Sequence, residues 1–144
     1  MNQPKIVVAT YAQRAIDPNA ILQLYKAVGW PWINRERAVL AIVLNADPAV
    51  GAWDGQALIG FARAVTDGHF RAYIEDVAVH PVYQRQSIGR QIMAQLLSEL
   101  THIDTISLFC QNDLVSFYTD LGFKRRGSQV VLHRAAPQQC QSIL

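Results

Sequence analysis

The segment from Tyr73 to Arg90 constrains the fold most, because it runs as an apolar strand through a polar loop directly into a helix. Its second half is helical by pattern, since apolar side chains recur at helical spacing from Ile88 to Leu100. A strand that leads straight into an amphipathic helix is typical of a domain in which a sheet and helices share one core.

The remaining segments predict further strands and helices around this unit. Asp17-Pro18 predicts a helix start, with an N-cap followed by proline, and the apolar face behind it ends at Gly29. The pairs Asp54-Gly55 and Asp67-Gly68 each predict a turn between strands. In chain order we expect a strand at 6–9, helices at 18–28 and 34–44, strands at 49–53, 57–65 and 72–79, a helix at 88–100, a strand at 105–110, a helix at 116–121 and a strand at 129–133. This order predicts an α/β (α+β) fold, with a mixed central sheet of about six strands and about four helices.

Length and charge narrow the function classes. The 144 residues, 51% of them hydrophobic and 17% charged, suit a globular chain, and we expect a single domain over residues 1–134 with a flexible tail at 135–144. The 13 Lys and Arg side chains are scattered and the formal net charge is +2, so no basic stripe indicates a nucleic-acid partner.

Neither a membrane nor a metal is indicated by the sequence. No apolar run reaches the roughly 18 residues that span a bilayer, and the N-terminus lacks the hydrophobic segment of a signal peptide, so we expect a cytoplasmic protein. Cys110, Cys140 and the four histidines lack the spacing of metal ligands. We therefore expect no metal, and free thiols in a reducing compartment.

The helix start after the polar loop is a candidate anion site. The first N–H groups of a helix have no partner within it, and the helix dipole attracts negative charge there. Small residues at Ser87 and Gly89 would let a phosphate approach the main chain, and Arg85 and Arg90 add positive charge. The alternative is that these small residues only serve packing.

This loop resembles the pyrophosphate loop of the GCN5-related N-acetyltransferase superfamily, which reads Arg/Gln-x-x-Gly-x-Gly/Ala. Residues 84–89, QRQSIG, match its first and last positions and depart at Ser87, where the family usually has glycine. Residues 76–81 and 117–123 are similar to the family's fourth strand and to its last helix and turn, and the resemblance covers about residues 6–133. It implies the family's fold and an acyltransferase that moves an acetyl group from acetyl-CoA to an amine.

The resemblance also implies which residues contact the coenzyme. The main chain at Val77 and Val79 would hydrogen-bond the pantetheine arm as a neighbouring strand would. Asn112 lies where the family often places a coenzyme contact, although it or Asp113 could instead cap a helix. The expected coenzyme-binding residues are Val77, Ala78, Val79, Gln84, Arg85, Gln86, Ser87, Ile88, Gly89, Arg90, Asn112 and Tyr118.

The resemblance gives Tyr118 the role of general acid, protonating the departing thiolate. A phenol suits this task because its pKa lies within about two units of that of a thiol. The alternative is that Tyr118 is a core aromatic of its helix, like Phe117. With no cysteine expected near the motif, we expect direct attack by the amine rather than an acetyl-enzyme.

Glu75 and Asp76 are the candidates for the base that takes a proton from the amine. Neighbouring residues of a strand point to opposite faces unless a bulge intervenes, so only one should face the acceptor. Related sequences favour Asp76, whereas a carboxylate in a strand often only pairs with a nearby arginine. Asp76, Glu75 and a water relay to solvent all stay open.

The acceptor follows only loosely from the resemblance. The chain looks like small bacterial and chloroplast members, some implicated in acetylating arylalkylamines such as serotonin or protein lysines, so a small-molecule amine or a protein amine is expected. Trp30 and Trp32 either cover a pocket or pack between helices. A non-catalytic acetyl-CoA sensor is the alternative function, and a homodimer is left open.

Overall fold

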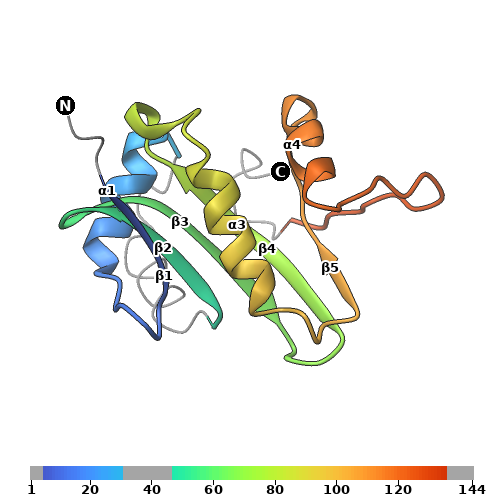
Figure 1. Ribbon diagram of the computed structural model, residues 1–144. Coiled ribbons are helices and arrows are strands. Elements are labelled where there is room, and N and C mark those ends of the chain that lie inside the picture. Colours follow the sequence, from blue (N-terminus) through green and yellow to red (C-terminus); the bar gives the residue numbers. More distant parts are fainter. Residues whose placement is uncertain (1–4, 31–46, 136–144) are drawn as a thin grey trace.

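The computed structural model describes residues 5–30 and 47–135 (Figure 1). Within them a five-stranded sheet has the order β1-β2-β3-β4-β5, in which all neighbours are antiparallel except β4 and β5, which are parallel. The strands are β1 (Ile6–Thr10), β2 (Ala49–Asp54), β3 (Ala57–Thr66), β4 (Arg71–Val79) and β5 (Thr105–Ser107). The sheet is therefore mixed, as expected.

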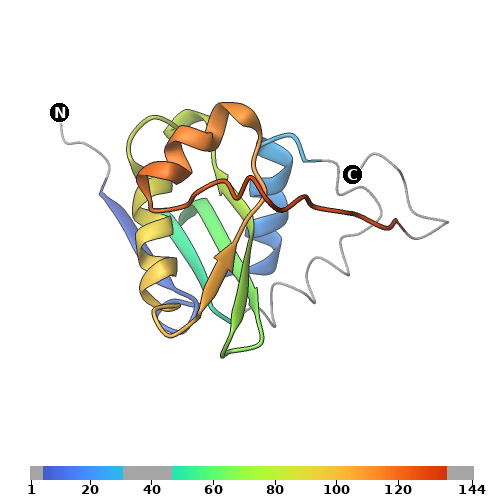
Figure 2. The same cartoon turned by 90° about the vertical axis from the view of Figure 1, so that its right-hand side faces the viewer.

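Helices cover both faces of this sheet, with α1 on one side and α3 on the other (Figure 2). The α-helices are α1 (Pro18–Ala27), α3 (Ile88–Ser98) and α4 (Val115–Asp120), and the short 3₁₀ helices are η1 (Pro81–Tyr83) and η2 (Asn112–Leu114). Asp17 caps α1 as predicted, because its carboxylate accepts the N–H of Asn19 at 3.0 Å. Gly29 follows with φ +82°, a conformation that glycine adopts without strain.

Each face of the sheet has its own core. On the α3 side, Ile92, Met93 and Leu96 pack against β2, β3 and β4, and on the α1 side Ile21 and Leu24 pack with aromatic side chains. Gly60 of β3 allows the close approach of α3, since a Cβ at this position would lie 2.5 Å from Cδ1 of Ile92. The position of α3 over the sheet is thus set by direct contact.

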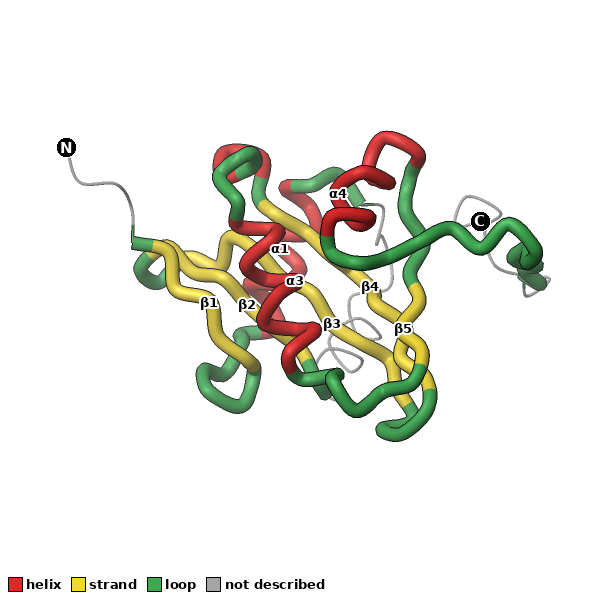
Figure 3. The backbone as a smooth tube through the Cα atoms, turned by 45° about the vertical axis from the view of Figure 1, so that its right-hand side comes forward, coloured by secondary structure: helices red, strands yellow, loops and turns green. Residues whose placement is uncertain are grey.

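The strands β4 and β5 pair only at their beginnings. Arg71, Ala72 and Tyr73 lie opposite Thr105, Ile106 and Ser107, and past that point the described chain shows no further pairing between the two segments. The two strands spread apart toward the end of β4 (Figures 1 and 3). This leaves a gap beside the second half of β4.

Most predicted elements are confirmed, and two strands differ. The strand expected at 105–110 ends at Ser107, because there the chain leaves β4. The strand expected at 129–133 is wrong, because this segment makes no strand pairing in the described chain. The predicted helix at 34–44 and Trp32 lie outside the described residues, and the domain boundary at residue 134 stays a prediction. Trp30 packs on Tyr25 with ring centroids 5.0 Å apart, which supports the packing interpretation.

Candidate active site

The edge of β4 that faces the gap carries main-chain hydrogen-bonding groups. The N–H of His80 donates to the carbonyl of Ile59 on β3 at 2.8 Å, so by alternation the main-chain groups of Val79 point away from β3 and toward the gap. The side-chain amide of Gln84 donates to the carbonyl of Val79 at 3.0 Å. An extended ligand could pair with such an edge as an additional strand does.

The loop after β4 turns sharply into α3. Arg85 has φ +64° and Ser87 has φ +65°, and Ser87 is the N-cap of α3 without making a side-chain capping bond. The first N–H groups of α3 therefore have no cap from this side chain, in a loop geometry that forms anion-binding concavities. Arg90 in the first turn is exposed and lies 3.5 Å from Asp120 of α4. The structure thus places an anion-attracting helix start at the end of the open strand edge.

The packing of Gly89 shows where α3, α4 and β4 meet. A Cβ added at Gly89 would lie 3.6 Å from the ring of Phe117 and 3.7 Å from a methyl group of Val79, which are ordinary contacts. The protein's own packing therefore has room for a methyl group here and does not require glycine.

Replacing Ser87 by glycine should raise the free energy of unfolding by about 1 kcal/mol. Serine at positive φ carries a steric cost that glycine does not, and this gain exceeds the entropy that glycine loses on folding. Urea denaturation checks the change. Ser98→Gly at the end of α3, where serine has ordinary helical geometry, is the control and should lower stability. A less stable Ser87→Gly protein would contradict the strain.

Tyr118 of α4 is a core residue whose hydroxyl feels the charge of Cys110. It is 7% exposed, and its ring packs edge-on against Phe117 at 4.9 Å and Phe123 at 6.0 Å. Burial and the nearby charge of Cys110 raise the pKa of its hydroxyl, which keeps the proton there at neutral pH. The expectation that no cysteine lies near the motif is wrong, since Cys110 follows the splayed end of β5 and interacts with Tyr118.

A β-bulge sets the geometry of the two adjacent carboxylates. Phe61 lies opposite Ala78 and Arg63 opposite Glu75, so β4 has one residue more than β3 between these pairs. Asp76 in the bulge has φ +59°, a conformation that aspartate tolerates better than most residues. Because the bulge interrupts the alternation of the strand, Glu75 and Asp76 both lie on the α1 face, which is the exception that the sequence left open.

Asp76 pairs with two side chains from other elements. Nε of Arg63 donates to its carboxylate at 2.7 Å and the hydroxyl of Tyr25 donates at 2.9 Å. The side chains of Arg63 and Asp76 are only 12% and 9% exposed, so this is a nearly buried ion pair. Asp76 therefore has the arginine partner that the sequence left open as its alternative role.

Glu75 has a different environment from its neighbour. Burial raises the pKa of Glu75, the charge of Asp76 raises it further, and the hydrogen bond from Tyr73 and the charge of Arg63 oppose the rise. Burial and the bond to Glu75 in turn raise the pKa of the Tyr73 hydroxyl. The Tyr73 ring lies edge-on to Phe109, 5.2 Å away. A carboxylate of raised pKa beside aromatic rings is suited to accept a proton.

Asn112 lies in η2 and is hydrogen-bonded to another side chain of the protein. It begins η2, and its amide oxygen accepts a bond from Arg125 at 3.1 Å. It does not cap a helix, because the residue before η2 is Gln111 and the residue before α4 is Leu114. Its contact with a coenzyme stays a prediction.

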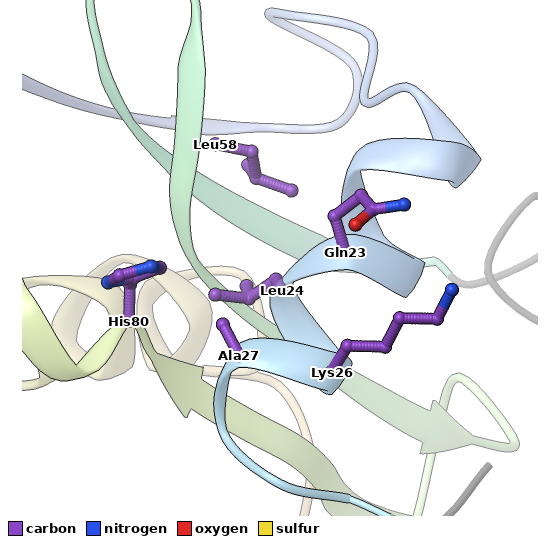
Figure 4. A pocket seen from close by; sticks show the side chains of 6 residues that line it. All are labelled: Gln23, Leu24, Lys26, Ala27, Leu58 and His80. Atoms are coloured by element: carbon purple, nitrogen blue, oxygen red, sulfur yellow. The ribbon is translucent and has the colours of Figure 1, made fainter.

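A pocket of about 470 Å³ lies between α1, β3 and the end of β4. It is lined by Gln23, Leu24, Lys26, Ala27, Leu58 and His80. In Figure 4 the Lys26 side chain extends away from Leu24 and His80, so the polar groups do not converge on one point. We assign no chemistry to this pocket.

Two sequence expectations concern metals and membranes. Over residues 5–30 and 47–135, no group of three or more His, Cys, Asp or Glu side chains could hold a metal ion. In the same part of the chain, no helix is long and apolar enough to cross a bilayer.

Comparison with known proteins gives the family. The model of the acetyltransferase (GNAT) family matches residues 19–123. The chain belongs to this family. Acetyl-CoA is the acetyl donor that GNAT enzymes generally use, which agrees with the anion-attracting helix start and the open strand edge.

Several GNAT proteins are similar over most of the chain. An uncharacterized N-acetyltransferase ycf52 from Pyropia yezoensis is 47% identical over 108 residues, which is 70% of this chain and 61% of that protein. Serotonin N-acetyltransferase 2, chloroplastic, from rice is 32% identical, over 75% of this chain and 56% of that protein. The GNAT family protein SP0256 from Streptococcus pneumoniae has a TM-score of 0.76 and 27% identity, covering 94% of this chain and 100% of that one. The chain spans less than two thirds of the curated relatives it matches.

Sequence reasoning missed Arg63 and Tyr25. Arg63 had a usable signal, because it is a lone charge in the otherwise apolar strand 57–65, and such a charge needs a buried partner. Tyr25 had none, since it fits the apolar face of its helix.

Proposed function

We propose that this chain is an acetyl-CoA-dependent N-acetyltransferase that moves the acetyl group to a primary amine by direct attack in a ternary complex. The observation that carries the proposal is the open edge of β4, which leads through residues of positive φ into the N-terminus of α3. The pyrophosphate would bind the first N–H groups of α3, and the pantetheine arm would pair with Val77 and Val79.

In the proposed reaction, Glu75 of β4 acts as the base and Tyr118 of α4 acts as the acid. Glu75 takes the ammonium proton of the amine and passes it to solvent, and the freed nitrogen attacks the thioester carbonyl. The carbon–sulfur bond breaks, the sulfur takes the hydroxyl proton of Tyr118, and the resulting phenolate takes the second proton that the acylated nitrogen gives up. Holding both substrates together makes the attack effectively intramolecular, which lowers its entropic cost.

A cationic amine is the acceptor that the site would favour. Glu75 is half-buried beside Asp76, and burial strengthens the attraction of a carboxylate for a cation. Tyr73 and Phe109 would offer ring surface to an aromatic or alkyl substituent. The name of the rice relative supports small aromatic amines, and a lysine side chain meets the same charge requirement.

A thiol-release assay with acetyl-CoA and an amine panel tests the proposal. The panel contains 2-phenylethylamine, tryptamine, spermidine and a lysine peptide, and calorimetry measures acetyl-CoA binding in parallel. We expect binding together with amine-dependent thiol release. Initial rates should give intersecting double-reciprocal lines, whereas parallel lines would indicate an acetyl-enzyme, for which Cys110 is the nearby thiol.

The alternative is an acetyl-CoA sensor without catalysis. Ser87 favours it, because a side chain stands where the family usually has glycine and could change the cradle for the phosphates. Binding without thiol release from any amine would support the sensor and overturn the enzyme.

Tyr118→Phe should lower kcat by about 100-fold, at the lower end of what a general acid contributes, because a thiolate is already a fair leaving group. Steady-state kinetics across neutral pH measure the loss. Tyr11→Phe, at the end of β1, is the matched control and should leave kcat unchanged. Equal turnover by Tyr118→Phe and wild type would leave Tyr118 with its packing role alone.

A further inference from the structure

The ion pair at the bulge connects three elements of the fold. Asp76 on β4 is held by Arg63 of β3 at 2.7 Å and by Tyr25 of α1 at 2.9 Å. Tyr25 is 1% exposed, and its ring also packs with Trp30 at 5.0 Å and Phe61 at 6.4 Å, so its hydroxyl is held in place. The carboxylate of Asp76 is thus fixed from two sides.

This fixation separates the roles of the two carboxylates. Asp76 is committed to Arg63 and Tyr25, whereas Glu75 is half-buried with a bond from Tyr73. Glu75 lies opposite Arg63 in the regular part of the strand, so the pleat alone places it on the same face as Tyr73; if the bulge straightened, Asp76 would turn to the α3 face. Holding Asp76 at the bulge therefore keeps its carboxylate beside that of Glu75.

We propose that Arg63 and Tyr25 are positioning residues, which clamp Asp76 at the bulge so that its carboxylate stays on the α1 face beside Glu75, the group that accepts the amine proton. The inference rests on the proposed function for the role of Glu75, and on the geometry of the bulge for the rest.

The charges around Glu75 give the clamp a measurable signature. The titratable and charged groups that face Glu75 are Tyr73 and Asp76 on β4, Arg63 on β3 and Tyr25 on α1. Asp76 raises the pKa of Glu75 and Arg63 lowers it. Removing the charge of Asp76 should move the titration of Glu75 to lower pH, and removing that of Arg63 should move it to higher pH.

The test follows the side-chain carboxyl of Glu75 by ¹³C NMR in protein labelled at its three glutamates, Glu36, Glu75 and Glu99. Asp76→Asn keeps a residue that tolerates positive φ and should shift the Glu75 titration to lower pH. Arg63→Gln should shift it to higher pH, and Arg63→Lys should restore it. The titration of Glu99, which lies at the end of α3, should stay unchanged in every variant.

Kinetics supply the second measurement, with the panel amine that gives the fastest thiol release. Asp76→Asn removes the negative charge beside Glu75 and Tyr25→Phe releases one side of the clamp on that charge, so each should lower kcat/KM by about 10- to 100-fold, and the acid limb of Asp76→Asn should move to lower pH. Arg63→Lys should recover most of the activity lost in Arg63→Gln.

Different failures separate the two hypotheses. An unchanged Glu75 titration in both Asp76→Asn and Arg63→Gln would overturn the clamp, even in an active enzyme. Loss of turnover in Asp76→Asn at every pH, with full turnover in Glu75→Gln, would make Asp76 the base and also overturn it. If the Glu75 titration shifts as expected but the protein releases no thiol with any amine, the proposed function is overturned. Only the contacts of Arg63 and Tyr25 with Asp76 would then stand.

Discussion

Replacing Glu75 by glutamine should lower kcat/KM for the acceptor amine by about 100- to 10,000-fold. An alkylamine such as a lysine side chain has a pKa near 10.4, so at neutral pH almost all of it carries the proton that blocks attack. A base held at the site removes this proton during the reaction, and general bases contribute rate factors of this size. Steady-state kinetics with saturating acetyl-CoA measure the loss.

The pH profile of the wild-type enzyme adds a second check. Because burial and Asp76 raise the pKa of Glu75, the rate should fall with decreasing pH at a higher pH than for an ordinary carboxylate. A raised pKa in the folded state disfavours the ionised form, so this group contributes its stability at low pH and loses it as pH rises through that pKa. Glu75→Gln should therefore be at least as stable as wild type at neutral pH.

Glu99→Gln is the matched control, since Glu99 ends α3 at the molecular surface. It should leave kcat/KM unchanged. If Glu75→Gln folds, binds acetyl-CoA and keeps full activity, the base is a water relay or another residue.

Arg63→Met should destabilise the fold by about 3–5 kcal/mol, the usual consequence of leaving one member of a buried ion pair alone. Asp76 is 9% exposed, and with methionine opposite it would keep the bond from Tyr25 but lose the positive charge that offsets its own. In a domain of this size the loss corresponds to a decrease in Tm of about 10 °C, which differential scanning calorimetry detects.

Two further variants show whether the loss of stability comes from the unpaired Asp76. Arg71→Met removes an exposed arginine at the start of β4 and should change stability by less than about 0.5 kcal/mol. The double variant Arg63→Met/Asp76→Asn should recover part of the stability, because it no longer leaves a buried charge. A small effect of Arg63→Met alone would mean that water reaches Asp76 more freely than its 9% exposure indicates.

The local rules of sequence predicted the parts of this fold that depend on neighbouring residues. Asp17-Pro18 starts α1, and Gly55 and Gly68 take positive φ in the turns between β2, β3 and β4. The loop from Gln84 to Gly89 lies between a strand and a helix, where the resemblance placed it. Each of these features depends on a short segment whose conformational preference is readable in the chain.

The parts that escaped prediction depend on contacts between distant segments. The bulge at Asp76 is visible only when β3 is paired with β4, because it is a mismatch in their register. The role of Asp76 depends on Tyr25, which is 51 residues away in the chain. The early end of β5 reflects its separation from β4, and nothing in the residues 108–110 marks it.

Gly60 has no side chain, which allows α3 and the N–H groups at its start to lie close to the sheet. A Cβ at this position would lie 2.5 Å from Cδ1 of Ile92, so either the Ile92 side chain or α3 itself would have to move. The distance between these N–H groups and the end of β4 thus depends on the contact between α3 and the backbone of β3. The loop before α3 sets the direction of these N–H groups, and β3 sets their distance from the sheet.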